Sequence, residues 1–243
     1  MVAISSGAAR AGMTAIPPPG SGESPQDGRM CTSSAPPAGF PKNSPACPGV
    51  TAASGHIFDG MGLELHIKVP TNASAVSFDF SFFSVEFPQY VCASSGNNDQ
   101  FVALLSSTAA STPADHNVSF DAQGNSVNVN NAFMEVCAPM TMFNGKTYAC
   151  PLGASLLGGT GIALPNQSDG NGNPYTAGGG TGWLTTQAAV VPGETITLRF
   201  AIWDAGDNTL DSTALIDHLT WTLRSGTAPP PPAAPPVTMR SPR

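Results

Sequence analysis

Charged residues are scarce in this 243-residue chain, at 10% of the total, and basic residues are the scarcest of them. Three lysines and six arginines against 16 acidic residues leave a formal net charge of −7, so the chain lacks the basic surface that binds nucleic acid phosphates. It also lacks a run of 18 or more apolar residues, which is the signature of a membrane-spanning helix. We therefore expect no nucleic acid partner and no direct insertion into a membrane.

The sequence patterns of many enzymes and metal sites are missing too. The chain has no C-x-x-C pair, no zinc-type histidine spacing, no nucleophile elbow and no P-loop or dinucleotide-binding pattern. Its 24 prolines argue against a helical bundle, because a proline in a helix interior costs about 3 kcal/mol. The hydrophobic content of 41% is nevertheless enough for a packed core.

Composition divides the chain into three parts. Residues 1–50 are rich in Ser, Gly and Pro without periodicity, which predicts an irregular arm. Residues 51–224 carry the periodic apolar segments and are the predicted folded domain. Residues 225–243 include the run Pro229–Pro232 and are predicted to form a proline-rich linker or tail.

Apolar residues in the middle part alternate with polar ones, and this period of two predicts half-buried strands. The alternation covers residues 63–69, 76–82 and 196–202, and a fourth set shares one parity: Leu215, Leu219, Trp221 and Leu223. Residues 100–106 are more uniformly apolar, which is typical of a central strand.

Polar residues around 117–130 predict a further hairpin, and no 12-residue window has the pattern of an amphipathic helix. The expected fold is therefore all-β. We predict a two-sheet antiparallel β-sandwich, jelly-roll-like, with long loops at 137–182 and irregular termini.

Five dispersed cysteines and little lysine are typical of an exported protein with disulfides. Cys137 and Cys150 flank a short loop that a disulfide could close, and Cys47 with Cys92 could tie the arm to the sandwich, leaving Cys31 unpaired. Four cysteines allow three pairings, so the connectivity stays open. Residues 1–29 lack the basic start and apolar run of a secretory signal, so either a signal has been removed or the protein stays inside the cell.

Acidic residues gather in two places. Asp204, Asp207 and Asp211 fall within eight residues of a glycine-containing turn, where they repel one another unless a cation or hydrogen-bond donors intervene. Such a loop can supply oxygen ligands to calcium, and the alternative is that Asp and Asn form an Asx-type turn between two strands. Glu86 and Asp99 lie at the ends of apolar strands, either as turn caps or as a carboxylate pair for glycoside hydrolysis.

Both acidic segments carry a resemblance to a known family. The stretch Phe83-Ser-Val-Glu86-Phe-Pro88-Gln-Tyr90-Val-Cys92, followed by Asn98-Asp99-Gln-Phe101, resembles the first motif of the choice-of-anchor L domain. Asp204-Ala-Gly206-Asp207-Asn-Thr-Leu-Asp211-Ser212 resembles its second motif. The resemblance spans about residues 40–224. Within the family, this sequence is similar to the domains of myxobacterial surface proteins. Ser84-Val85 departs from the family pattern, because many members have an additional acid there.

The resemblance implies an exported bacterial module, extracellular or on the cell surface, with no common catalytic reaction. It also places Glu86, Asp99, Asp204, Asp207 and Asp211 at matching motif positions, where strand-end acids at one rim of a sandwich would form a calcium site or a buried hydrogen-bonded knot. We expect no cofactor other than calcium.

Three functions remain open at this point. The first is a non-enzymatic structural or adhesion module that associates with itself or with other surface proteins. The second is a carbohydrate- or polymer-binding module of a secreted hydrolase, with glycans as partners, although three tryptophans and three tyrosines offer little for a sugar platform. The third is a hydrolase that uses Glu86 and Asp99. We expect the first, and hence no enzyme.

Overall fold

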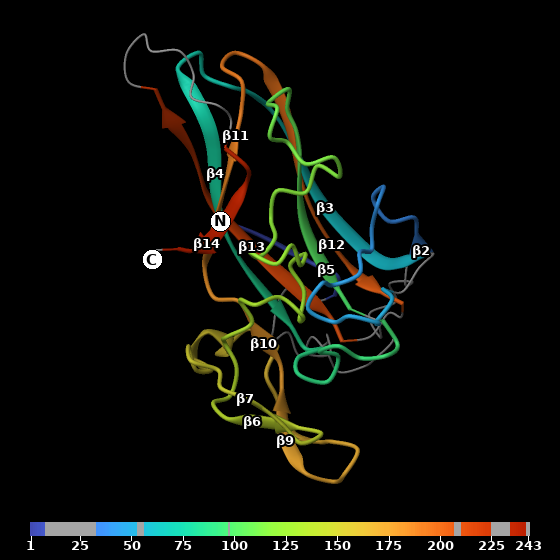
Figure 1. Cartoon of the computed structure of the whole chain (residues 1–243). Coiled ribbons are helices and arrows are strands. Elements are labelled where there is room, and N and C mark those ends of the chain that lie inside the picture. Colours follow the sequence, from blue (N-terminus) through green and yellow to red (C-terminus); the bar gives the residue numbers. More distant parts are fainter. Residues whose placement is uncertain (8–32, 53–55, 97, 207–209, 225–233, 242–243) are drawn as a thin grey trace.

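The chain folds into two antiparallel sheets that pack face to face (Figure 1). The computed structural model describes residues 1–7, 33–52, 56–96, 98–206, 210–224 and 234–241. Nearly all of the regular structure in these residues is strand, with a single turn of 3₁₀ helix, η1 (Ser155–Leu157). The predicted all-β sandwich is confirmed. No helix in the described part of the chain is long and apolar enough to cross a membrane.

The larger sheet has the strand order β1-β13-β4-β11-β14, with the short β10 also paired to β4. Its strands are β1 (Val2–Ser5), β4 (Ala73–Ser84), β10 (Gly179–Gly180), β11 (Leu184–Ala189), β13 (Ser212–Leu223) and β14 (Val237–Arg240).

The smaller sheet has the order β2-β3-β12-β5. Its strands are β2 (Ser33–Ser34), β3 (Ile57–Lys68), β5 (Gln100–Ser106) and β12 (Thr195–Ala205). Two hairpins stand outside the sheets, in the yellow region at the lower end of Figure 1. They are formed by β6 (Thr141–Phe143) with β7 (Lys146–Tyr148), and by β8 (Leu164–Ser168) with β9 (Pro174–Ala177).

Aromatic residues fill the space between the two sheets. The alternation in β4 places Phe78, Phe80 and Phe82 in the core, as the sequence predicts. Phe78 meets Phe200 of β12 edge to face with 4.9 Å between ring centroids, and Phe80 stacks on Phe101 of β5 at 5.0 Å. These pairs join the sheets and contribute about 0.5–1.5 kcal/mol each beyond the burial of their area.

The uniformly apolar strand β5 is the last named strand of its sheet, but its outer edge is bridged at Phe101 to Val127 and at Leu104 to Asn117. Both of its faces are covered as well, which accounts for its apolar character. Ala103 faces the main core, whereas Val102 packs on the other side with Phe40 and Trp203. The segment 33–52, which carries Phe40, therefore acts as a cover for the smaller sheet.

The single parity predicted along β13 is wrong. Ala214 and Ile216 face the core at the start of the strand, and Trp221 packs against it at the end. A register shift between Asp217 and Thr220, with His218 at φ 54°, exchanges the two faces. A second register shift follows between Thr222 and Leu223, and Leu223 is exposed.

Both terminal parts of the chain add a strand to the larger sheet. β1 pairs with β13 and β14 pairs with β11, so each covers part of one edge. Thr238 in β14 bonds to Thr186 with 2.8 Å between hydroxyl oxygens, and Arg240 bonds to the carbonyl oxygen of Phe133 at 3.0 Å. Residues 8–32 and 225–233 of these terminal parts lie outside the described residues.

Candidate functional site: a buried acidic cluster

The acids that the sequence singles out meet at one end of the sandwich. Glu86 follows β4, Asp99 precedes β5, Asp204 is next to last in β12, and Asp211 precedes β13. Ser84 is paired with Ser212, and Gln100 with Trp203, so these four strand ends are neighbours within their sheets. We refer to Glu86, Asp99, Asp204 and Asp211 as the acidic cluster. Asp207, the fifth predicted acid, lies outside the described residues.

Asp99 connects the two sheets through its carboxylate. One oxygen accepts a hydrogen bond from the main-chain N–H of Ala205 in β12 at 3.2 Å, and the other accepts one from the Ser212 hydroxyl of β13 at 2.7 Å. The side chain is 1% exposed. Burial raises the pKa of Asp99 well above its usual range, the charge of Glu86 adds to this increase, and the Ser212 and Ala205 bonds offset part of it.

Glu86 is the second buried member, at 2% exposure. Its Oε2 atom accepts a hydrogen bond from the main-chain N–H of Asp99 at 2.9 Å, and its own N–H donates to the Ser84 hydroxyl at 3.0 Å. Glu86 thus holds the loop between β4 and β5 closed. The carboxylates of Glu86 and Asp99, which the hydrolase hypothesis needs, are therefore engaged in hydrogen bonds within the fold.

Asp204 is buried to the same extent, at 1% exposure, but neither of its carboxylate oxygens has a hydrogen-bond partner. Burial raises the pKa of Asp204 well above its usual range, and the charges of Asp99 and then Asp211 add to the increase. The nearby Ser6 hydroxyl offsets part of this increase in pKa, although that hydroxyl donates its hydrogen bond to the Ser212 carbonyl oxygen at 3.4 Å. Protonation is the least costly state of such a group.

The start of the chain covers the outside of the cluster. The N–H of Ser6 donates to the Ser212 carbonyl oxygen at 3.0 Å, and the Ser5 hydroxyl donates to the same oxygen at 3.0 Å. Gly7 packs so closely on the Asp211 carboxylate that a Cβ at position 7 would overlap it. Strand β1 and the two residues after it therefore help to exclude water from the acids.

The described carboxylates do not by themselves make up a calcium shell. Asp99 and Glu86 bind main-chain and hydroxyl donors, and in the described part of the chain no group of three or more His, Cys, Asp or Glu side chains is arranged to hold a metal ion. Calcium needs six to eight oxygen ligands. The hydrogen-bonded knot is the alternative that these contacts support, and calcium stays a prediction.

Two disulfides brace the loops around this end of the molecule. Cys47 is bonded to Cys92, 45 residues away, and Cys137 is bonded to Cys150, 13 residues away. Both predicted pairings are therefore present in the structure. Cys31 lies outside the described residues.

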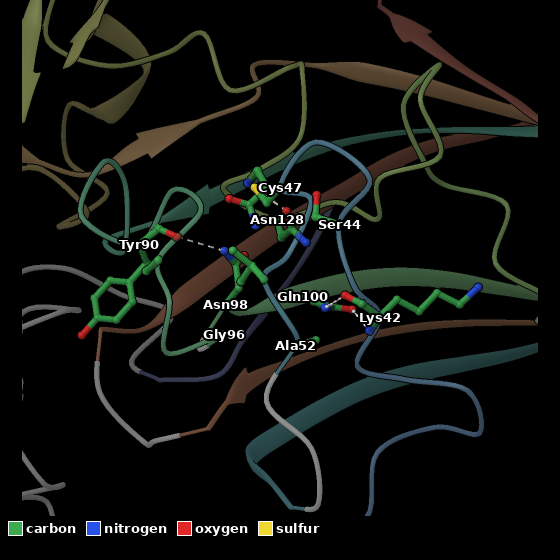
Figure 2. Close-up of a pocket in the computed structure, with 12 residues that line it drawn as sticks. Lys42, Ser44, Cys47, Ala52, Tyr90, Gly96, Asn98, Gln100 and Asn128 are labelled. Atoms are coloured by element: carbon green, nitrogen blue, oxygen red, sulfur yellow. Dashed lines mark hydrogen bonds between the residues drawn. The ribbon is translucent and has the colours of Figure 1, made fainter.

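A small pocket lies beside the Cys47–Cys92 bond (Figure 2). The side chain of Gln100 bonds there to the main chain of Lys42, and the Asn98 amide donates to the Tyr90 carbonyl oxygen at 3.4 Å. The cavity measures about 10 Å³, which is space for roughly one water molecule. Its polar side chains hold the covering segment in place, and the cavity is too small for a substrate.

Sequence reasoning missed the hydroxyl groups that complete the cluster. Ser212 stands directly after Asp211 in the second motif, and this position was the one available signal for its role. Ser6 comes from the irregular arm and carries no recognisable pattern. Only the return of the chain's first residues to β13 brings it to the acids.

The comparisons with known proteins give one match. Residues 54–220 match the family model described as Choice-of-anchor L domain, which is more than half of the chain and includes both acidic motifs. Neither the curated proteins nor the solved structures include a match to this chain.

Proposed function

The chain belongs to the choice-of-anchor L domain family, and from this premise we propose that it is a structural module outside the cell that adheres to, or assembles with, neighbouring surface molecules and copies of itself. Domains of this family are in general surface-associated or exported and non-catalytic. Two disulfides in the domain agree with an oxidising compartment.

The observation that carries the proposal is the burial of the motif acids. A hydrolase needs carboxylates that its substrate can reach, yet Glu86 and Asp99 are 2% and 1% exposed. Their oxygens accept hydrogen bonds that close the β4–β5 loop and join the two sheets. Chemical labelling of carboxyl groups in the folded chain tests this role, because a reagent that reaches surface acids will not reach these.

A glycan-binding module finds less support. Sugar-binding platforms present aromatic rings to solvent, and no described Phe, Tyr or Trp of this chain is exposed. The largest exposed apolar side chains in the described residues are aliphatic, including Met61 and Leu223. Adhesion through protein contacts is therefore the form of the function that we propose.

We include calcium in the proposal as a stabilising ion, on the ground that Asp204 is buried with both oxygens free of partners. If calcium binds, a concentration 100 times its Kd should stabilise the fold by about 2.7 kcal/mol. That gain corresponds to a rise in Tm of roughly 5–10 °C for a chain of this size. Thermal unfolding in calcium and in chelator measures it, with Asp204→Asn as the variant that loses the response. An equal Tm in the two buffers removes calcium from the proposal.

A further inference from the structure

One long strand edge of the sandwich has no covering strand in the described part of the chain. β3 pairs with β12 along one side, and on its other side β2 reaches only Ile57 and Phe58. No strand or main-chain hydrogen bond among the described residues meets its outer edge from Gly60 to Lys68. In the larger sheet, β1 covers residues 213–216 of β13 and β14 covers residues 184–187 of β11. An open edge of this length is a template for pairing with another strand.

The side chains on this edge match the needs of an added strand. Leu63, Leu65 and Ile67 are half-buried and pack against the main core, so their remaining exposed area would be buried by a neighbouring strand. Glu64, His66 and Lys68 lie on the opposite face in solvent, with the Glu64 and His66 side chains 49% and 66% exposed.

The charges identify the neighbour. From Gly60 to Lys68 this edge carries one acid and one base, Glu64 and Lys68, placed symmetrically about His66. Antiparallel pairing of two copies about a two-fold axis through His66 sets each Glu64 opposite Lys68 of the second copy and each Leu65 opposite Ile67. Side chains directly opposite each other in antiparallel strands are about 4.5–5.5 Å apart at Cβ, and opposite charges in such positions attract. No ion pair among the described residues includes Lys68.

We propose that the β3 edges of two copies of this chain pair antiparallel about His66 and join the two smaller sheets into one continuous sheet. This inference rests on the self-association part of the proposed function and names its surface. Because the same patch meets itself, the contact closes on a dimer. Growth into a filament would need a second, different contact.

Charge exchange tests the pairing. In Glu64→Lys or Lys68→Glu, both Glu64–Lys68 pairs become like-charge pairs. We expect each variant to weaken dimerisation about tenfold or more. The double variant Glu64→Lys/Lys68→Glu restores opposite charges and should return the dimer Kd to near the wild-type value. Sedimentation velocity over a protein concentration series, at low and at high salt, measures all four chains, and the thermal unfolding of each shows that the exposed substitutions leave the fold intact.

The outcomes separate the inference from the proposed function. A wild-type dimer that is weakened by both single variants and recovered in the double variant supports the β3 contact. Dimers or larger particles that are unaffected by the charge changes overturn the β3 contact and leave self-association in place. A wild-type chain that stays monomeric at every concentration overturns both the contact and self-association, while labelling of the buried acids still tests the structural role of the module.

Discussion

Removal of the Cys47–Cys92 disulfide, in a double Cys47→Ser/Cys92→Ser variant, is expected to lower the free energy of unfolding by about 4 kcal/mol. The bond joins residues 45 apart, and closing a loop of this length restricts the unfolded chain strongly. The shorter Cys137–Cys150 loop, with a separation of 13, should contribute about 3 kcal/mol by the same chain-entropy relation.

The folded state has a second reason to depend on the Cys47–Cys92 bond. It fastens the segment whose Phe40 meets Trp203 edge to face, with 6.1 Å between ring centroids, on the outer side of the smaller sheet. Asn125 and Asn130 hold the same region, by accepting hydrogen bonds from the main-chain N–H groups of Ala46 and Cys92, each at 2.8 Å. Loss of the disulfide leaves only noncovalent contacts, these and the Gln100–Lys42 bonds among them, to hold the cover.

Equilibrium unfolding in denaturant measures both losses. A Cys31→Ser background prevents disulfide exchange through the fifth cysteine, and the Cys137→Ser/Cys150→Ser variant is the matched control. A loss below about 1 kcal/mol for the Cys47–Cys92 pair would show that the 33–52 cover does not depend on its covalent link.

A second large effect is expected at Asp204. The folded chain raises the pKa of this carboxyl and of Asp99, so it retains protons that the unfolded chain releases above about pH 3.9. Their stabilising contribution is present in full below that pH and is lost as the pH rises through the raised folded values. In chelator, the stability of the wild-type chain should therefore fall from acidic towards alkaline pH.

Asp204→Asn should remove the part of this fall that belongs to Asp204, because the amide does not ionise. The raised pKa therefore predicts that the difference in stability between the variant and the wild type shifts in favour of the variant by about 1–3 kcal/mol between about pH 4 and about pH 8. Asp211→Asn, at the half-buried rim of the cluster, should show a smaller shift. No change in this difference with pH, or a change in favour of the wild type, would mean that the ionised carboxylate makes a favourable contact.

Much of the architecture is predictable because one physical rule dominates it. In a strand with one face in the core and one in solvent, apolar and polar residues alternate. The alternating segments 63–69, 76–82 and 196–202 coincide with β3, β4 and β12, apart from Val69, which directly follows β3. The rule fails where local geometry breaks the period. The bulge at 217–220 in β13 reverses which side chains of the strand face the core, and none of its residue types predicts a bulge.

Position within the sheet is less predictable than the strands themselves. β5 reads as a central strand because both faces are apolar, but the second face is covered by Phe40 from a loop far away in the sequence. β1 and β14 carry short patterns that do not stand out from the Ser-, Gly- and Pro-rich parts around them. Long-range pairing, which no local pattern encodes, makes them strands.

The candidate site was predictable in its members and not in its contacts. Strand-end acids in two motifs indicate a shared rim, and Glu86, Asp99, Asp204 and Asp211 do meet there. Which of them is bonded depends on donors contributed by Ala205 and Ser212, whose roles follow only from the register of β12 and β13. Asp204 is left without partners for the same reason.

That the motif acids close the sandwich, and do not contact a substrate, is tested most directly by carbodiimide-driven labelling of carboxyl groups in the native chain, read out by mass spectrometry. Glu64, with half of its side chain exposed, is the internal reference. We expect Glu86, Asp99 and Asp204 to stay unlabelled while Glu64 reacts, and to react once the chain is unfolded. Labelling of Glu86 and Asp99 in the folded chain at the rate of Glu64 would contradict a structural role. It would mean that a substrate can reach this pair of acids, as the hydrolase hypothesis requires.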